Sequence, residues 1–537
     1  MPSNEASSAS ESAAAAQSTR TREVEWKLVS DEDMDFEGIR ALLTDADLGE
    51  GSTIRLTATY YDTADLRLAR RGITLRRRTG GHDDGWHLKL PNRPAHGEVL
   101  DRDEIALPLE HSDDPPAELR SLVAAYARSG EIHVIGVLRT HRAVHPLVVD
   151  GVIIGELCRD EVRADIARPD QLATPTVVFH EWEVEARAGA VAKVESIVNH
   201  LLAHGFTRST SESKLRQALG DAALIPDALT HDESPTRRRS AREDITYYLK
   251  DQVEALLVQD HRVRLELPDA VHRSRVAARR LRSALRTFAP VLDSEALAPL
   301  RADIVWAADI FGRERDLEVI ENRLVETLDS MTNGDDPAAA HERHGVQVAR
   351  TIVVEDLRER RAEAHRSIIE AFDSPRWINM LDQLVDLAHD PPTTGRAGKA
   401  ASRVLPPLAL KQWKALSDRA KHLTNDDPAE SWHHARISAK RARYAAEACA
   451  PAMGHEPARF AKALAEVTEL LGDLQDTQVS RDYLNELVNA GIQDADAMFA
   501  LGRLYSSEER AAERMRASFP SVWARAARPR LRRWLRG

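Results

Sequence analysis

Cysteine is scarce in this sequence and long apolar runs are missing, and both absences exclude whole classes of protein. The only two cysteines, Cys158 and Cys449, lie far apart in differently patterned regions. This excludes a disulfide framework and a zinc site built on several thiolates, so any metal must be held by oxygen or imidazole. No run of about 18 apolar residues occurs, and no charged N-terminal region precedes an apolar one. We therefore expect a cytoplasmic protein without a membrane partner.

An excess of basic residues is also missing, because 74 Lys and Arg residues are outnumbered by 86 Asp and Glu residues and the net charge is −12. The chain as a whole has no nonspecific attraction to nucleic acid or acidic lipid, and we expect no nucleic-acid partner. A site for a polyanion would require local clustering of basic side chains. The 537 residues, 42% of them hydrophobic, are enough for several globular domains.

The patterns along the chain predict two domains of different class. Residues 1–20 contain Ser, Ala and Glu but no aromatic residue, which predicts a disordered leader. Residues 21–220 alternate apolar and polar positions between turn residues, as antiparallel strands do. Residues 221–240 form the expected linker. Residues 241–520 have long 3.6-residue periods that predict an all-α domain, and residues 521–537 are the expected basic C-terminal tail.

The helical half contains an internal repeat. The segment VHRSRVAARRLRSAL from Val271 recurs as WHHARISAKRARYAA from Trp432, and FGRERDLEV from Phe311 recurs as LGDLQDTQV from Leu471. The two pairs have nearly the same offset, 161 residues between the histidines and 160 between the aspartates. Two segments in the same order at the same offset predict two helical bundles related by duplication.

Four predicted strands place charged residues on a single face. In EVEWKL, alternation puts Glu23, Glu25 and Lys27 on one face and the apolar residues on the other. The same holds for three further sets: Glu181 with Glu183 and Glu185, Arg76 with Arg78, and His87 with Lys89. One interpretation is a sheet whose outer face is wet. The other is a barrel with a charged interior, in which carboxylates hold Mg²⁺ or Mn²⁺ and basic side chains hold phosphate.

The segment from Glu23 to Lys27 resembles the ExExK signature of the CYTH, or triphosphate tunnel metalloenzyme, family. The resemblance covers residues 21–220 and extends, in order, to Tyr60-Tyr61-Asp62-Thr63, Leu75-Arg76-Arg77-Arg78, Lys89, Arg102 with Glu104, Asp160, Glu181-Trp182-Glu183-Val184-Glu185 and Ser213-Lys214-Leu215. It implies an eight-stranded antiparallel tunnel that binds a linear triphosphate and cleaves its terminal phosphoryl group with a divalent metal.

The resemblance also implies roles for individual residues. The implied ligands of Mg²⁺ or Mn²⁺ are Glu23, Glu25, Asp160, Glu183 and Glu185. The implied phosphate contacts are Lys27, Arg76, Arg78, Lys89, Arg102, Arg139 and Lys214. Of these, Lys214 is expected to reach the tunnel mouth from a C-terminal helix. Leu215 follows it where the family usually has an aromatic residue.

Basic side chains form a stripe on the helix expected from Val271 to Phe288. The members of the stripe are spaced by 3, 4, 3 and 4 residues: His272, Arg275, Arg279, Arg282 and Arg286. The second copy repeats it with His433, Arg436, Lys440 and Arg443. A solvated basic face is the simplest interpretation. No acid intervenes in the first copy, however, and like charges at these spacings destabilise a helix by about 0.2–0.5 kcal/mol per pair, so a bound polyanion would explain the pattern better.

This half resembles the CHAD family across about residues 240–520. VHRSRVAARRLR fits the family pattern H-x-x-R-V-x-x-R-R-L-R, and Arg315-Asp316 fits its R-D element; the second copy departs from the pattern at Lys440, Ala442 and Gln475. The resemblance implies binding of inorganic polyphosphate along a basic groove between two four-helix bundles. The residues implied are His272, Arg275, Arg279, Arg280, Arg282, His433, Arg436, Lys440, Arg441 and Arg443. The alternative is that His272 and His433 act as metal ligands.

Together these interpretations predict a multidomain α+β protein, with an N-terminal eight-stranded antiparallel tunnel barrel and a C-terminal all-α pair of four-helix bundles. The expected function is metal-dependent hydrolysis of inorganic triphosphate coupled to binding of inorganic polyphosphate. Thiamine triphosphatase and adenylate cyclase stay open as alternatives, because no pocket for either base can be read from these residues. A noncatalytic protein that carries polyphosphate to polyphosphate granules is the alternative from another class.

Overall fold

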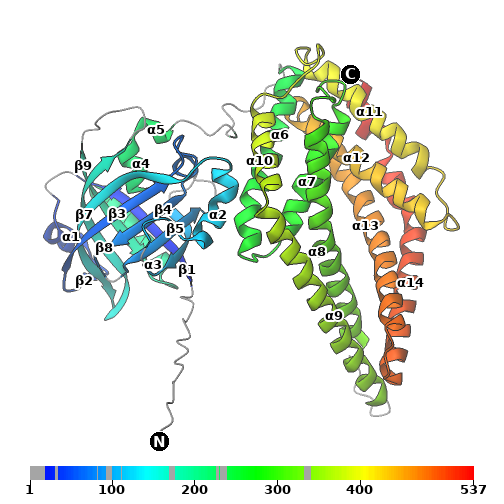
Figure 1. The fold of residues 1–537 in the computed structure, drawn as a ribbon, viewed down its shortest axis with the longest axis horizontal. Helices are drawn as coiled ribbons and strands as arrows, with labels where there is room; N and C mark the ends of the chain where they lie inside the picture. The colour runs from blue at the N-terminus through cyan, green and yellow to red at the C-terminus, as the bar shows by residue number, and fades with distance from the viewer. Residues whose placement is uncertain are drawn as a thin grey trace, which may run out of the picture. The chain divides into compact units, whose positions relative to one another are not determined.

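The computed structural model describes residues 18–30, 34–81, 83–91, 100–109, 112–167, 176–224, 229, 239–331 and 340–536. The chain divides into two compact units, residues 1–227 and residues 228–537 (Figure 1). Among the helices of the described residues, none is both long enough and apolar enough to cross a membrane.

In the described residues, the first unit is a closed antiparallel barrel of eight strands with two short strands at its margin. The strand order is β1–β6–β5–β4–β3–β7–β8–β9, and pairing of β9 with β1 closes the barrel. The eight strands are β1 (Thr19–Val29), β3 (Ser52–Asp62), β4 (Thr74–Thr79), β5 (Gly85–Pro91), β6 (Leu100–Leu107), β7 (His133–Val149), β8 (Val152–Ile166) and β9 (Val177–Ala186). The short strands are β2 (Asp47–Leu48) and β10 (Thr207–Arg208). The predicted tunnel barrel is confirmed.

Strand alternation on β1 places apolar side chains outside the barrel and charged ones inside it. On β1, Trp26 and Leu28 point outward into a core that includes Ile39 of α1 (Phe36–Leu42) and Val198 of α3 (Val191–Ala203). Because successive side chains leave a strand on opposite sides, the charged residues of β1 point into the barrel. Two further elements of this unit are α2 (Ala117–Ala127) and the 3₁₀ helix η1 (Ala69–Arg71), which lie between strands in the chain.

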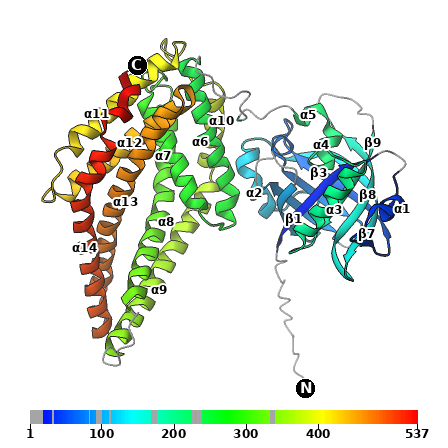
Figure 2. The same ribbon diagram turned by 180° about the vertical axis from the view of Figure 1, so that it is seen from behind.

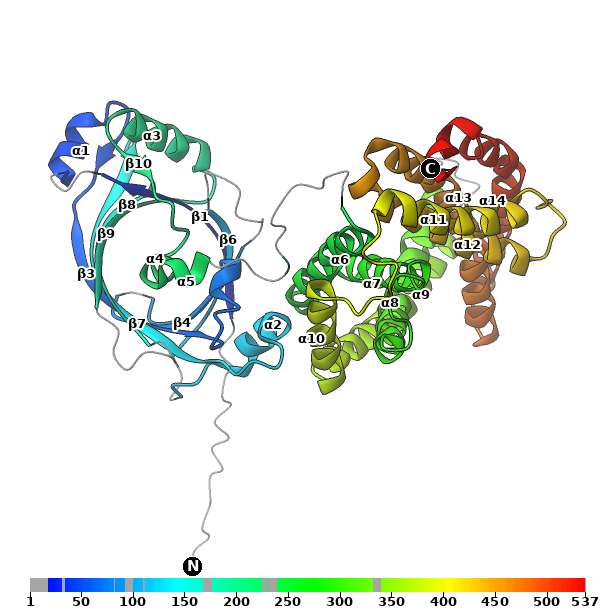
Figure 3. The same cartoon turned by 90° about the horizontal axis from the view of Figure 1, so that it is seen from above.

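Two short helices, α4 (Lys214–Leu219) and α5 (Asp221–Leu224), lie within the ring of strands (Figure 3). The Ser213 side chain caps α4 by accepting a hydrogen bond from the Arg216 backbone N–H at 3.1 Å. Leu215 is 1% exposed and packs with Tyr60 and other barrel residues, so leucine fills the position where the family usually has an aromatic side chain. This packing fixes Lys214 at the first turn of α4.

The second unit is all-α and consists, in the described residues, of nine α-helices and a terminal 3₁₀ helix. The helices are α6 (Ala241–Arg264), α7 (Ala270–Thr287), α8 (Ala298–Met331), α9 (Ala340–Phe372), α10 (Pro375–His389), α11 (Ala401–Ala420), α12 (Ala429–Met453), α13 (His455–Asn489) and α14 (Ala495–Ala526), followed by η3 (Pro529–Arg536). Both side views show α6–α10 beside α11–α14 (Figures 1 and 2). The duplicated segments form α7 with α8 and α12 with α13, and α7 packs against α12. The predicted bundle pair is confirmed.

Three predicted boundaries move, two because apolar side chains are buried beyond them and one because exposed residues extend the pairing of β1 with β6. The predicted linker gives its first residues to α5, where Ala223 is 1% exposed. The predicted tail is not a tail, since its beginning continues α14 and Trp534 and Leu535 of η3 are buried. Thr19 and Arg20, predicted in the leader, belong to β1. The rest of the predicted leader and most of the predicted linker fall outside the described residues.

Candidate functional site

The barrel interior contains a cavity of about 460 Å³ whose wall is rich in charged side chains. They come from seven strands and from α4, which explains why no single stretch of sequence contains the site. The acidic members on these elements are Glu23, Glu25, Glu104, Glu156, Glu183 and Glu185, joined by Asp83 from the segment between β4 and β5, and the basic members are Lys27, Arg76, Arg78, Lys89, Arg102, Arg142 and Lys214.

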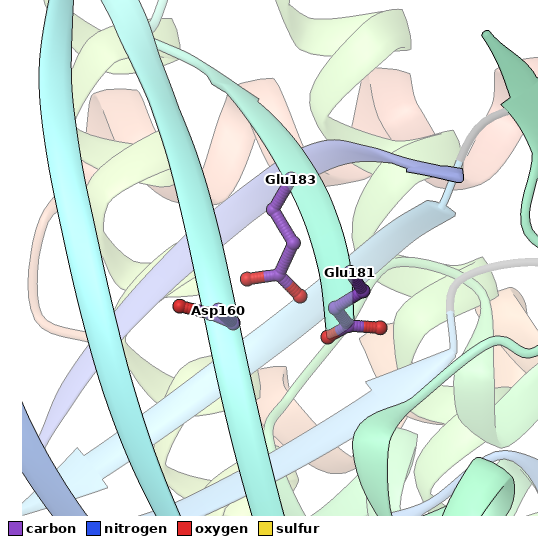
Figure 4. Close-up of side chains that lie close together, drawn as sticks. All are labelled: Asp160, Glu181 and Glu183. Carbon is purple, nitrogen blue, oxygen red and sulfur yellow. The ribbon is translucent and has the colours of Figure 1, made fainter. Parts of the chain in front are cut away.

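At one place in the barrel, three buried carboxylates converge, and we call them the triad: Asp160 of β8 with Glu181 and Glu183 of β9. One ligand oxygen of each lies within 4.8 Å of the others, and Figure 4 shows the three side chains turned toward one another. Asp160 and Glu181 are in register on neighbouring strands, and Glu183 follows two residues further along the same face. Such a cluster would repel itself strongly without cations among it.

Three basic side chains supply those cations. The Lys214 Nζ lies 2.9 Å from Asp160 Oδ2, 2.5 Å from Glu181 Oε1 and 2.6 Å from Glu183 Oε1. Lys27 Nζ lies 3.0 Å from Glu181 Oε1 and also contacts Glu183. Arg142 donates two hydrogen bonds to Asp160, at 2.8 and 2.6 Å, and a third to Glu183. Three carboxylates thus meet three cations, so the charges of the triad and its three basic partners sum to zero.

The pKa shifts agree with this balance. Burial by itself lowers the pKa of Lys214, but Asp160, Glu181 and Glu183 outweigh burial and raise it well above its ordinary value. Burial likewise raises the pKa of Glu183, while Lys214, Lys27 and Arg142 outweigh it and hold that pKa well below the usual range. These groups are therefore charged at neutral pH. A metal ion could use the triad only by displacing a lysine or the arginine.

A second group of carboxylates, Glu23, Glu25 and Glu185, is less completely balanced. Lys89 Nζ lies 2.5 Å from Glu23 and Arg102 donates to Glu25 at 2.8 Å, whereas no hydrogen bond or ion pair links Glu185 to another of the described residues. Burial, followed by the charge of Glu23, raises the pKa of Glu185 to about 7. Two cations for three carboxylates leave a site suited to a cation, and oxygen ligands suit Mg²⁺ or Mn²⁺. The donor set thus fits a divalent ion.

Basic side chains from β4, β5 and β6 face the same cavity. Arg76 donates to the Tyr60 hydroxyl at 3.4 Å and lies 3.9 Å from Glu104. Arg78 pairs with Asp83, yet burial, and then the neighbouring Arg76, lower its pKa to about 10, so a further anion placed here would relieve repulsion between the two guanidinium groups. Guanidinium groups suit the oxygens of a phosphate chain, because they present several N–H donors in a plane.

The structure brings most of the predicted tunnel residues together, and it corrects one. Arg139 does not reach the cavity: its side chain is 57% exposed and pairs with Asp165 on the outside of the barrel. Arg142, three residues later on β7, has the opposite orientation and lines the cavity instead. Sequence reasoning missed Arg142 and the role of Glu181. Counting strand parity from the other cavity residues of β7, Thr140 and Val144, would have selected Arg142.

In the second unit, cations from the two duplicated helices meet where α7 packs on α12. We call Arg275, Arg279, Arg436 and Lys440 the groove cluster. Arg275 pairs with Asp316 of α8 at 2.7 Å, but no hydrogen bond or ion pair links the other three, all half-buried, to another described residue. Burial, then Arg436, Arg279 and Arg275, lower the pKa of Lys440 to about 6. A bound anion would relieve the repulsion among these basic groups and raise the pKa of Lys440 back towards its ordinary value, so the groove cluster favours an anionic ligand.

The other members of the predicted stripe have different surroundings. Arg441 lies near Arg282, which extends the basic surface beyond the groove cluster. Arg280 and Arg443 instead pair with Glu447, at 3.0 and 2.8 Å. The helices α7 and α12 thus carry basic side chains on two sides. One side holds the groove cluster, and the other holds Arg280 and Arg443, which pair with Glu447.

The two histidines of the stripe line separate pockets. His272 belongs to a cavity of about 330 Å³ with Glu314, Glu318 and Glu321. The Nδ1–H of His433 donates a 2.8 Å hydrogen bond to Gln475 Oε1, and His433 lines a cavity of about 200 Å³. Neither histidine belongs to a group of three metal-ligating side chains among the described residues.

Comparison with known proteins agrees with both halves of this description. Residues 21–219 match the CYTH domain family and residues 247–485 match the CHAD domain family. The uncharacterized protein Rv2226 of Mycobacterium tuberculosis is 31% identical over 499 residues, which are 90% of this chain and 91% of that protein.

Solved structures similar to parts of this chain include PptA from Streptomyces chartreusis, with 22% identity, a TM-score of 0.45, and coverage of 53% of this chain and 100% of that chain. The CHAD domain from the plant Ricinus communis gives 25% identity, a TM-score of 0.42, and coverage of 55% and 94%. The closed barrel with its charged interior is a triphosphate tunnel domain. The chain belongs to the family of proteins that join a CYTH domain to a CHAD domain, which confirms the family resemblance.

Proposed function

We propose that the tunnel domain hydrolyses inorganic triphosphate with a divalent metal. The observation that carries this proposal is the juxtaposition, in one cavity, of an undercompensated carboxylate group with a basic wall. Glu23, Glu25 and Glu185 would hold Mg²⁺ or Mn²⁺, which would supply charge neutralisation and a positioned water when bound. A linear triphosphate carries negative oxygens along its whole length, which suits a cavity whose basic side chains come from several strands.

The chain's own side chains perform the remaining steps of this proposal. Arg76 and Arg78 bind the oxygens of the phosphate chain from β4, and Lys89 and Arg102 bind them from β5 and β6. Lys27 and Lys214 act from the triad side, where their charge offsets the negative charge that builds up as the terminal phosphoryl group is transferred. The strands and α4 hold these groups before the substrate arrives, so little reorganisation is needed.

A phosphate-release assay tests the proposal. The full chain should release phosphate from inorganic triphosphate with added Mg²⁺ or Mn²⁺, and chelation should stop the reaction. ATP, thiamine triphosphate and polyphosphate serve as competing substrates, and a clear preference for one of them would replace inorganic triphosphate as the substrate. Absence of turnover on all four would sink the proposal and favour a noncatalytic polyphosphate-binding protein.

We further propose that the CHAD domain binds inorganic polyphosphate through the groove cluster. The supporting observation is that Arg279, Arg436 and Lys440 are half-buried basic groups without an ion pair to another described residue, and that the two arginines lower the pKa of Lys440, a shift that a bound anion would reverse. A flexible polyanion would bind by several such point contacts, and its affinity would fall steeply with salt. Polyphosphate affinity measured at two salt concentrations tests this directly, since salt-independent binding contradicts an electrostatic groove.

A further inference from the structure

A buried carboxylate that does not line the cavity holds two lysines that do. Glu181 Oε1 lies 3.0 Å from Lys27 Nζ and 2.5 Å from Lys214 Nζ. Its side chain is 0% exposed, and it is absent from the cavity wall to which both lysines belong. Glu181 therefore contacts the groups that would meet a phosphate without being able to meet a phosphate itself.

The other oxygen of this carboxylate has an unusual environment. Oε2 of Glu181 is buried and has no hydrogen-bond partner among the described residues. Leaving a buried polar atom unpaired costs about 1–3 kcal/mol, and more for a charged group. The carboxylate is thus not placed here for its own stability. What it provides is a negative charge at the point where two lysines from different elements, β1 and α4, converge.

Glu183 also contacts both lysines, but it differs from Glu181 in one respect. Glu183 lines the cavity, so a ligand in the tunnel can compete for it. Glu181 is reached by no such ligand and keeps its hold on Lys27 and Lys214 when the cavity is filled. Long lysine side chains lose considerable rotamer freedom when fixed, so a permanent partner is needed to keep both ammonium groups in place.

We propose that Glu181 is a positioning residue, which fixes the ammonium groups of Lys27 and Lys214 at the cavity wall so that both meet the same end of a bound triphosphate. This inference rests on the proposed triphosphatase function. Without Glu181, two carboxylates would be left for three cations, so the wall would become more positive. Triphosphate would then bind equally well or more tightly, yet the two ammonium groups would no longer be aligned for the transferring phosphoryl group.

The experiment uses the full chain and three variants. Glu181→Gln removes the charge and keeps the shape, Glu181→Asp keeps the charge on a shorter side chain, and Glu161→Gln is the matched control, on β8 next to Asp160 but on the outer face with its side chain 39% exposed. Calorimetry gives the dissociation constant and stoichiometry for inorganic triphosphate without metal. Steady-state kinetics with Mg²⁺ give kcat per binding site.

For Glu181→Gln we expect an unchanged stoichiometry and a dissociation constant equal to that of the wild type or up to about tenfold lower. We expect kcat to fall by about 10- to 100-fold, because misplacing a catalytic group by about 1 Å has an effect of this size. Glu181→Asp should recover part of the kcat, and Glu161→Gln should match the wild type. A purely structural role would instead lower the stoichiometry and leave kcat per site unchanged, which overturns the proposal. Binding weakened by more than tenfold overturns it as well.

Amine labelling followed by mass spectrometry decides the inference separately from turnover. Triphosphate should protect both Lys27 and Lys214 from acylation in the wild type, and in Glu181→Gln it should protect them several-fold less although it still binds. Equal protection in both proteins would show that Glu181 does not position the lysines. A third outcome is that triphosphate binds and protects the lysines more strongly in the wild type than in Glu181→Gln, while the wild type releases no phosphate. That outcome would refute the proposed hydrolysis, and the positioning role would stand.

Discussion

Single residues in the tunnel are defined by the direction of their side chains more than by their chemical type. Arg76 and Arg139 are both arginines on barrel strands, yet only Arg76 reaches the cavity. The side chain of Arg76 is 14% exposed and that of Arg139 is 57% exposed. A guanidinium held inside a low-dielectric cavity interacts far more strongly with an anion than one in water does.

This contrast gives a matched pair of mutations. Arg76→Ala removes a charge-assisted contact worth about 1.5–3 kcal/mol, so kcat/KM for inorganic triphosphate should fall by about 10- to 100-fold. Arg139→Ala removes the same side chain from the outer surface and should leave kcat/KM within about twofold of the wild type. Equal losses in the two variants would mean that the arginine assignment is wrong.

Asp244 of the helical unit is the second residue whose position makes a measurable difference. Its side chain is buried near Cys449, and no side chain of the described residues hydrogen-bonds to its carboxylate oxygens. Burial raises the pKa of Asp244 from 3.8 to about 7, with Arg239 opposing the shift. Folded Asp244 therefore keeps its proton at pH values where the unfolded chain has lost it.

The stability of the helical unit should consequently depend on pH. The contribution of Asp244 is complete below about pH 4 and is lost as the pH rises to about 7, a change of the order of a few kcal/mol. Asp244→Asn should raise the free energy of unfolding clearly more at pH 8 than at pH 5, where only part of the contribution has been lost. Urea denaturation at both pH values measures this, and equal effects at pH 5 and pH 8 would contradict a neutral buried carboxyl group.

At the scale of elements, two helices acquire a property together that neither has alone. The stripe on α7 is an ordinary basic face until α12 packs against it and brings Arg436 and Lys440 to Arg275 and Arg279. Each helix then adds to the other's positive potential. Burial at the contact also removes the water that would screen it.

Charge reversal on both helices tests this shared surface. Arg279→Glu combined with Lys440→Glu should weaken long-chain polyphosphate binding at least tenfold and flatten its dependence on salt, while triphosphate hydrolysis continues. The control double variant, Arg273→Glu with Arg459→Glu, changes the net charge equally at exposed positions outside the groove cluster. If the control loses as much affinity as the groove variant, net charge and not the groove determines binding.

At the scale of the whole molecule, the division into two compact units predicts separable activities. Residues 1–227 contain the complete barrel with α4 and α5, and residues 228–537 contain both bundles. The first fragment should fold and hydrolyse triphosphate, and the second should bind polyphosphate. A first fragment shortened to residues 1–212 loses Lys214 and the buried Leu215 and Leu219, and it should be unstable and inactive.

Circular dichroism and the phosphate-release assay check these fragments. A folded first fragment without turnover would show that the helical unit contributes to the chemistry. Turnover in the fragment that lacks α4 would show that Lys214 is dispensable, which would also weaken the role proposed for Glu181.

The sequence by itself determined the architecture and most of the tunnel wall, because strand alternation and helical periodicity are local properties that short segments express directly. Glu23, Glu25 and Lys27 could be placed on one face from their spacing alone. The duplicated stripe could likewise be recognised from a repeat.

Only the tertiary structure decided how those faces are paired and balanced. The side chain of Arg142, and not that of Arg139, points into the barrel, and the triad contacts Lys27 and Lys214. The tertiary structure also left Glu185 without an ion pair to another described residue and paired Arg443 with Glu447 outside the groove cluster. Charge balance depends on distances between strands and helices that are far apart in the chain. Spacing within a single segment carries no information about those distances.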